Sequence, residues 1–399
     1  MRMRNIIAAA AVLAVLPLSC AVSGASAADV MASAADAAIK TAYHAAGVPF
    51  DNAVSAEAVT DDSAEAAAEE SQTDVTTAVD GLMQDTQESE AAAETVEAQQ
   101  TSEATGEDNK AQVISLNITE FDEGLDYTAE GNRSGSILRR TYGRYTSGDY
   151  LTLASGAQVR NCTTDSNESL IEASGHMPSL DIHCDVAEPQ VLIIHTHATE
   201  SFEPYTRDYF DTEFPFRTRD SSRNMVAVGA VLAQTLADNG ISVVHDGTLH
   251  DYPAYTGAYD RSEETIRAIL AEYPTIKVVI DLHRDAITEA DGSRVAPVAE
   301  IDGKNAAQFM IIAGCDNEYF DMPYYIENFK LAALLQNSAE VMYPGLARAV
   351  LFDYRNYNQH ITTGSLLIEV GSHANSLDEA LYTAQLLGES MAAALRSLE

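Results

Sequence analysis

Histidine and acidic side chains occur at the ends of three apolar segments in the second half of the sequence. The run "VLIIHTHATE" places His195, His197 and Glu200 directly after four aliphatic residues, "KVVIDLH" ends in His283, and "SLLIEV" carries Glu369. Ionisable groups in apolar segments are costly to bury unless they are paired or bound to a cation. Three separate cases favour one shared metal site over three unrelated buried groups.

Imidazole and carboxylate donors without a thiolate suit a catalytic zinc ion with three protein ligands and an open position. The candidate ligands are His195, His197, Glu200 and His283. His195 and His197 would share a face of a regular strand, and only one of them is needed as a ligand. The sequence leaves open which one binds.

Amide hydrolysis at such a site needs a carboxylate that takes the proton of the attacking water and passes it to the leaving amine. Glu369 is the candidate for this role. A structural ion pair of Glu369 with Arg284 or Arg348 is the alternative. Other hydrolytic designs are absent from the sequence, which has no GxSxG, HExxH or GxxxxGK[ST] motif.

Strands and helices alternate from residue 189 to 399. Apolar runs predict buried strands, and amphipathic runs between them predict helices. The expected strands are 190–196, 241–246, 276–285, 306–314 and 364–372, and the expected helices are 224–240, 260–274, 327–345 and 376–398. The spacings Asp260/Glu263 and Ser376/Glu379 are typical of capping boxes. The alternation predicts an α/β fold with a mostly parallel sheet, helices on both faces, and a site at the carboxyl ends of the strands.

Three segments precede this catalytic domain of residues 189–399. Residues 1–28 combine Arg2 and Arg4 with an apolar run and "ASA", which predicts a signal peptide or membrane anchor and an extracytoplasmic protein. Residues 29–110 read as a low-complexity, disordered acidic linker, and residues 111–188 as a small β-rich segment.

The charge of the chain excludes one class of partner. The net charge is −38, and residues 51–110 alone carry 17 Asp and Glu against one Lys. Such a surface repels nucleic acids, so we expect no nucleic-acid partner. No CxxC pair is present, and an exported chain leaves both pairing of Cys162 with Cys184 and two free thiols open.

The catalytic half resembles the stage II sporulation protein P family of exported cell-wall hydrolases. The resemblance covers roughly residues 190–399 and rests on motifs that keep their order. They are "VLIIHTHATESF", "NMVAVGAVLAQTL", "HDYPAYTGAYDRS", "VVIDLHRDA", "YPGLAR", "YNQH" and "GSLLIEVGSHANSLDEA".

The resemblance implies a zinc-dependent N-acetylmuramoyl-L-alanine amidase that acts on peptidoglycan, with a second cut at peptide cross-links. By position His197 and His283 resemble the family's histidine ligands, and Glu369 resembles its catalytic acid/base. The turn "HTHATE" departs from the wider amidase pattern "PGHGG", so the third ligand is Glu200 or Asp220. Arg284, Asn358, Gln359 and His360 match family motifs without an assigned role, and we expect them to contact substrate or to support the metal ligands.

The resemblance also implies work in sporulation and engulfment, beside the stage II sporulation proteins D and M. Two other functions remain as alternatives. A catalytically inactive module could bind peptidoglycan through the same sheet, and a metallopeptidase could cut proteins. Glycan-strand denudation that depends on a metal would favour the amidase.

Overall fold

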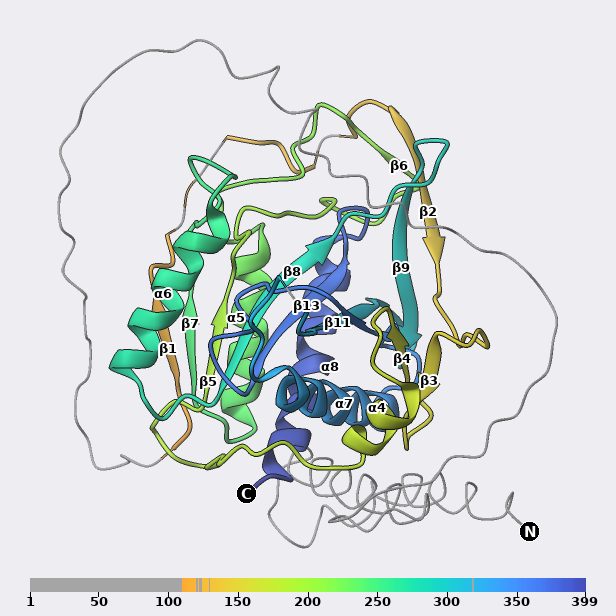
Figure 1. Cartoon of the computed structure of the whole chain (residues 1–399). Coiled ribbons are helices and arrows are strands. Elements are labelled where there is room, and N and C mark those ends of the chain that lie inside the picture. Colours follow the sequence, from red (N-terminus) through yellow and green to blue (C-terminus); the bar gives the residue numbers. More distant parts are fainter. Residues whose placement is uncertain (1–109, 120, 122–123, 129, 318) are drawn as a thin grey trace, which may run out of the picture. The chain divides into compact units, whose positions relative to one another are not determined.

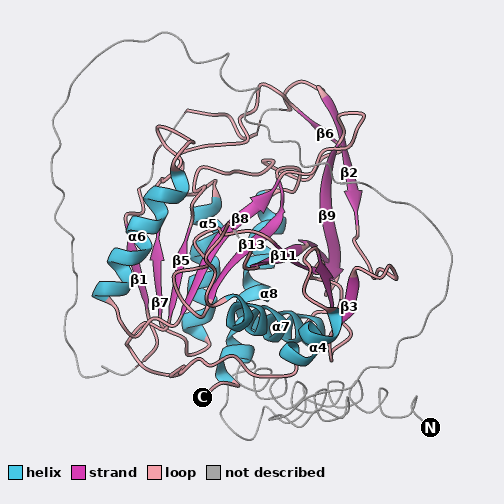
Figure 2. Ribbon diagram, in the orientation of Figure 1, coloured by secondary structure: helices cyan, strands magenta, loops and turns pink. Residues whose placement is uncertain are grey.

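A nine-stranded sheet forms the centre of the fold (Figures 1 and 2). The computed structural model describes residues 110–399 except 120, 122–123, 129 and 318. Six of the eight strand pairings in this sheet are parallel, and the pairs β13/β11 and β4/β3 are antiparallel. The prediction of a mostly parallel α/β fold is confirmed. In order across the sheet the strands are β1 (Val113–Leu116), β7 (Val243–Asp246), β5 (Val191–Ile194), β8 (Val278–Asp285), β13 (Ser365–Ser372), β11 (Phe309–Gly314), β12 (Val350–Asp353), β4 (Gln158–Asn161) and β3 (Tyr150–Thr152).

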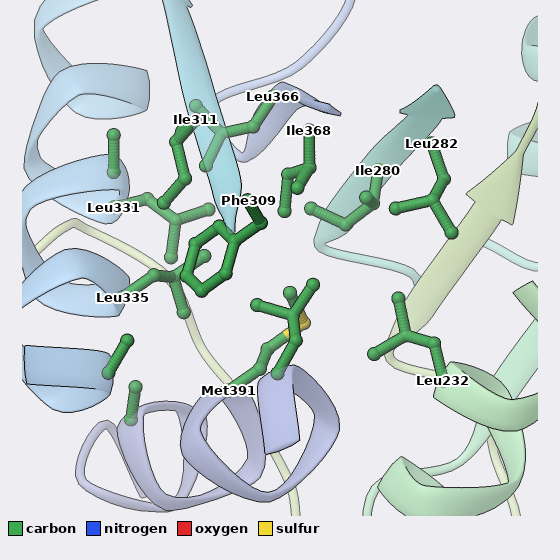
Figure 3. Close-up of a cluster of buried hydrophobic side chains, with 14 of the residues drawn as sticks. Leu232, Ile280, Leu282, Phe309, Ile311, Leu331, Leu335, Leu366, Ile368 and Met391 are labelled. Carbon is green, nitrogen blue, oxygen red and sulfur yellow. The ribbon is translucent and has the colours of Figure 1, made fainter. Parts of the chain in front are cut away.

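Helices pack on both faces of this sheet. One face, called here the α5 face, is covered by α4 (Asn167–Ser174), α5 (Met225–Asp238), α7 (Tyr325–Met342) and α8 (Leu377–Arg396). Figure 3 shows the main core on this side, where Leu232, Leu335 and Met391 meet strand residues. The opposite face, called here the α6 face, carries a smaller core against α6 (Ala258–Glu272).

Side-chain alternation along β8 explains how polar groups reach the α6 face. Ile280 and Leu282 belong to the core of the α5 face, whereas Val279 belongs to that of the α6 face. Successive residues of a strand point to opposite faces. Asp281 and His283 therefore follow Val279 on the α6 face.

A second, four-stranded sheet lies beside the first. It consists of β10 (Lys304–Ala307), β9 (Arg294–Ile301), β2 (Gly135–Arg140) and β6 (Tyr209–Phe210). The strands of residues 111–188 are distributed over both sheets: β1 forms one edge of the main sheet, β4 and β3 form the other, and β2 joins the second sheet. The strands of residues 111–188 therefore pair with strands of residues 189–399.

The two expected capping boxes have different outcomes. Ser376 and Glu379 form the box at the start of α8. The box at Asp260/Glu263 is wrong, because α6 begins earlier, after Gly257, and has no side-chain cap. Gly257 has a φ of 80°, a left-handed conformation that glycine adopts readily.

The expected leader (1–28) and nearly all of the expected linker (29–110) lie outside the described residues. Within the part of the chain that the structure describes, no helix is both long and apolar enough to cross a bilayer. The cysteines Cys162, Cys184 and Cys315 are free thiols in this structure, so Cys162 and Cys184 do not pair.

Candidate functional site

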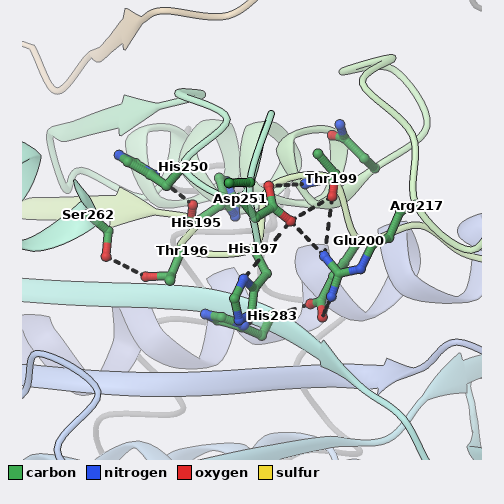
Figure 4. Close-up of polar contacts among 12 residues, drawn as sticks. His195, Thr196, His197, Thr199, Glu200, Arg217, His250, Asp251, Ser262 and His283 are labelled. Atoms are coloured by element: carbon green, nitrogen blue, oxygen red, sulfur yellow. Dashed lines mark hydrogen bonds and ion pairs between the residues drawn. The ribbon is translucent and has the colours of Figure 1, made fainter. Parts of the chain in front are cut away.

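Four of the predicted site residues come together on the α6 face of the main sheet. Glu369 on β13 is the register partner of His283 on the adjacent strand β8. The imidazole rings of His197 and His283 have their centroids 5.2 Å apart. Oε2 of Glu200 lies 3.7 Å from Nδ1 of His283 (Figure 4). The strand β8, its neighbour β13 and the turn after β5 thus supply two histidines and two carboxylates to one place.

His195 lies apart from this group, on the α5 face. Its Nδ1 is 2.9 Å from the carbonyl oxygen of Leu282, and its Nε2 is 3.0 Å from Nε2 of His245. A carbonyl only accepts, so Nδ1 of His195 carries the hydrogen, and Nε2 of His245 must donate to Nε2 of His195. Both ring nitrogens of His195 are therefore occupied in a fully buried pair beneath Gly229 of α5.

Several buried atoms of the site lack a hydrogen-bond partner. They include Nδ1 of His197 and Oε2 of Glu369, whereas Nε2 of His283 makes no well-angled hydrogen bond but lies 2.8 Å from Oδ1 of Asp281. Unpaired buried polar atoms are costly and uncommon, and they mark places where an ion or a water belongs. Two such atoms, on His197 and Glu369, belong to the group of side chains that meets on the α6 face.

The nitrogen and oxygen donors of the site suit a zinc ion, although the candidate ligand atoms lie farther apart than the ligands of a bound zinc ion. Two ligands of a tetrahedral zinc ion lie about 3.3 Å apart, given metal–ligand bonds of about 2.0 Å. Nδ1 of His283 and Oε2 of Glu200, at 3.7 Å, are close to that separation. Among the described residues, no group of three or more His, Cys, Asp or Glu side chains already has the arrangement of a metal site. His197 must approach the other two to complete one.

The two glutamates have opposite electrostatic settings. Burial alone would raise the pKa of Glu200, but the charges of Arg284, His283 and Arg217 outweigh it and lower this pKa. Burial, together with the charge of Asp285, raises the pKa of Glu369 to about 8. Glu200 is thus held ionised, whereas the pKa of Glu369 lies far above that of an ordinary glutamate.

Two buried aspartates lie next to the two histidines, and the sequence analysis did not predict them. Oδ1 of Asp281 is 2.8 Å from Nε2 of His283. Oδ2 of Asp251 is 4.0 Å from Nδ1 of His197. The signal for Asp281 was present, because it lies two residues before His283 on the same strand. Asp251 lies in the turn after β7, where no periodicity points to it.

Three tyrosines from separate loops and from α6 surround the histidines, and sequence reasoning missed them. The ring of Tyr255 stacks on His197 with centroids 4.5 Å apart and keeps 58% of its surface exposed. The ring of Tyr259 lies parallel to His283 at 6.4 Å, and Tyr357 stacks on Tyr259 at 5.3 Å. These rings line the solvent side of the site.

Arg284 is buried and supports Glu200 directly. Its backbone N–H donates to Oε2 of Glu200, and its guanidinium donates to the carbonyls of Ser201 and Phe216. Arg217 reaches the same carboxylate from the opposite loop, with Nη2 3.2 Å from Oε1 of Glu200. Arg284 is therefore a support for the carboxylate and for the 200–217 loop.

The other resemblance-based candidates lie in the loop after β12. Asn358 donates to Ser262 on α6, and Gln359 bonds to the backbone of β11. Nδ1 of His360 lies 3.0 Å from Oδ1 of Asn356 in the same loop. Asp220, the alternative third ligand, accepts from the backbone and hydroxyl of its neighbour Ser222. None of the four reaches the centre formed by His197, Glu200 and His283.

Comparisons with known proteins agree with the resemblance. The family described as stage II sporulation protein P matches residues 38–392. The stage II sporulation protein P of Bacillus subtilis (strain 168) is 32% identical over 202 residues, which is 47% of this chain and 47% of that protein. The chain thus spans about half the length of this curated relative.

Solved amidase structures show a weaker likeness. The N-acetylmuramoyl-L-alanine amidase AmiC2 of Nostoc punctiforme aligns with 53% of this chain and 96% of its own, at 12% identity and a TM-score of 0.31. The CwlD amidase from Clostridioides difficile, in complex with the GerS lipoprotein, aligns with 52% and 94%, at 12% identity and a TM-score of 0.32.

Proposed function

The chain belongs to the stage II sporulation protein P family, and we propose that it is an exported peptidoglycan hydrolase of sporulation. Its main reaction in this proposal is that of a zinc-dependent N-acetylmuramoyl-L-alanine amidase, which cuts the amide between the muramyl lactyl group and the stem peptide. A second cut at peptide cross-links uses the same centre. One observation carries the proposal: two histidines and two carboxylates converge on one sheet face with buried donor atoms that lack partners.

In this proposal His197, Glu200 and His283 hold the zinc ion. Bound zinc would polarise the scissile carbonyl and lower the pKa of a water molecule. Arg284 and Arg217 keep Glu200 charged and fix its carboxylate from two sides. His195 takes no part, since both of its ring nitrogens are engaged on the other face.

Glu369 is the proposed general acid/base. It takes a proton from the attacking water on a carboxylate oxygen and gives it to the leaving amine. Its buried Oε2 has no hydrogen-bond partner, so this oxygen is available to water or substrate. Against a structural ion pair with Arg284 or Arg348, Arg348 bonds to Asp285 at 2.8 Å, and the guanidinium of Arg284 donates to the carbonyls of Ser201 and Phe216.

Two other functions predict different products. An inactive binding module would retain peptidoglycan without releasing fragments, and a metallopeptidase acting on protein would leave purified sacculi intact. The unpartnered donor atoms favour hydrolysis, because gripping a stem peptide needs no metal centre.

Purified sacculi test the proposal. The whole chain should release free stem peptides and leave unsubstituted glycan strands, as identified by mass, and a chelator should stop the release. The variant Glu369→Gln should bind sacculi and release nothing. Absence of free stem peptides with the zinc-loaded protein would refute the amidase.

The cellular setting is part of the proposal. Residues 1–28 would direct export, either as a cleaved signal or as an anchor, and residues 29–110 would form a flexible tether. The stage II sporulation proteins D and M would be partners during engulfment. Pull-down with purified proteins D and M tests the contacts, and absence of binding would remove them from the account.

A further inference from the structure

A series of hydrogen bonds runs from the loop after β12 to Asp281, which lies beside Nε2 of His283. The side-chain amide of Asn358 donates to Oγ of Ser262 at 3.1 Å. That Oγ lies 2.7 Å from Oγ1 of Thr196 (Figure 4). Thr196 gives Asp281 two bonds, from its hydroxyl to Oδ2 at 2.7 Å and from its backbone N–H to Oδ1 at 2.8 Å. All four side chains in this series of hydrogen bonds are buried.

The donor and acceptor capacities of the four side chains indicate which group donates in each hydrogen bond. A carboxylate only accepts, so the single hydroxyl hydrogen of Thr196 points to Asp281. Since Thr196 has no second hydrogen for the 2.7 Å contact, the hydroxyl of Ser262 donates to Thr196 in preference to the carbonyl of Tyr259 at 3.1 Å, and the amide of Asn358 donates to Ser262. The two bonds from Thr196 thus hold the carboxylate of Asp281 in one orientation, and Ser262 and Asn358 hold Thr196.

The two ring nitrogens of His283 face different groups. Nε2 lies 2.8 Å from Oδ1 of Asp281, and Nδ1 lies 3.7 Å from Oε2 of Glu200. Histidines that bind metals usually donate their other ring N–H to a carboxylate, which fixes the tautomer and orients the ring. The placement of Asp281 behind His283 matches that arrangement.

We propose that Asp281 is a positioning residue that keeps the hydrogen of His283 on Nε2 and leaves Nδ1 free to bind zinc. Asn358, Ser262 and Thr196 hold Asp281 in that position. This inference rests on the proposed zinc site and adds to it the residues that prepare its histidine. It also gives Asn358 a role that does not involve contact with the substrate.

The backbone of the loop supports this role for Asn358. Tyr357 and Asn358 both have left-handed backbone conformations, with φ of 45° and 58°. Such conformations are unfavourable for a tyrosine and persist only where contacts hold them. Here the Tyr357 ring stacks on Tyr259, and Asn358 donates both to the carbonyl of Tyr259 and to Ser262. The strained turn therefore presents the amide to the hydrogen-bond chain.

Asp251 provides an internal comparison. It stands 4.0 Å from His197, whereas Asp281 stands 2.8 Å from His283. The charge of Asp251 is already matched by Arg217, whose Nη1 lies 2.6 Å from Oδ2. Loss of the Asp251 charge should therefore affect zinc binding less than loss of the Asp281 charge.

Zinc affinity of the full chain, measured by competition with a chromophoric chelator, tests the proposal. Asp281→Asn keeps the shape and removes the charge, and should weaken zinc binding about 10- to 100-fold. Thr196→Val, which removes one bond to Asp281, should weaken it a few-fold. Asp251→Asn is the matched control and should have a smaller effect than Asp281→Asn.

A second measurement reports the tautomer directly. A long-range ¹H–¹⁵N spectrum of the zinc-loaded protein should show the hydrogen of His283 on Nε2. A hydrogen on Nδ1, or wild-type affinity in folded Asp281→Asn, would overturn the proposal. If Asp281→Asn does not fold, Thr196→Val and the wild-type spectrum decide the question.

The outcomes separate this inference from the function on which it rests. Zinc binding with the expected tautomer but no cleavage of sacculi would refute the amidase and leave the positioning role intact. Failure of the wild-type chain to bind zinc would overturn both.

Discussion

The turn that follows β5 carries two histidines to opposite faces of the main sheet, and their surroundings differ. His195 on the α5 face is fully buried, and both of its ring nitrogens are bonded. His197 on the α6 face has an unpaired Nδ1 and lies beside His283. A satisfied buried histidine contributes to packing, whereas an unsatisfied one beside other donors indicates a ligand site. Changes on the α6 face should therefore affect activity, and changes on the α5 face should affect stability.

Glu369→Gln should have the largest effect on activity. The amide keeps the size of the side chain but cannot accept a proton, so the release of stem peptides should fall about 10²- to 10⁴-fold. The unfolding temperature should not decrease, because Gln removes a buried carboxylate that has no partner at Oε2. Cleavage assays and thermal unfolding of the same preparation check both points. Substantial remaining activity would place the acid/base elsewhere.

Removal of the metal should destabilise the protein through the ligands on the α6 face. A ligand that binds only the folded chain stabilises it, so a chelator should lower the unfolding temperature of the wild-type protein. His283→Asn should show little of this shift, because it lacks one of the ligands. Scanning calorimetry with and without chelator measures the difference. An equal shift in both proteins would mean that the metal binds away from His283.

Gly229→Ala tests the α5 face. A Cβ at Gly229 would lie 2.5 Å from Nε2 of His195 and 2.6 Å from Nε2 of His245, so the histidine pair must shift. We expect a loss of about 1–3 kcal/mol in the free energy of unfolding, measured with urea. Gly148→Ala is the control, since a Cβ there meets nothing within 4 Å. Zinc affinity should be retained, and its loss would show that the two faces are coupled.

The effect expected to be smallest near neutral pH is a pH dependence of stability from His245. Burial, and then the charge of His195, lowers the pKa of His245 to about 3. In the unfolded chain its pKa is about 6.5, so between these values the unfolded chain binds a proton that the folded chain does not. Stability should therefore fall as the pH decreases below about 6.5. His245→Asn should make this decrease less steep in urea titrations, and an unchanged slope would exclude His245 as a source.

Much of the fold and part of the site follow from sequence patterns. Apolar runs ending in polar residues located β5, β8 and β13, and thereby His283 and Glu369. Alternation along β8 also predicts that Asp281 shares a face with His283, although the sequence analysis assigned Asp281 no role. These features depend on regular strands, whose geometry is fixed by the backbone.

Other features depend on irregular segments and could not be predicted. Strand β5 ends at Ile194, and the turn that follows breaks the alternation that would have kept His195 and His197 on one face. The rings of Tyr255 and Tyr357 reach the site from loops, whose paths are set by tertiary contacts. The distribution of residues 111–188 over both sheets likewise depends on long-range pairing, to which local patterns do not respond.

The zinc content of two matched variants tests the central claim most directly. His197→Asn and His195→Asn make the same chemical change two residues apart. Elemental analysis of the purified full-length proteins should find about one zinc ion per chain in the wild type and in folded His195→Asn, and almost none in His197→Asn. Full zinc content in His197→Asn, with loss in folded His195→Asn, would contradict the account.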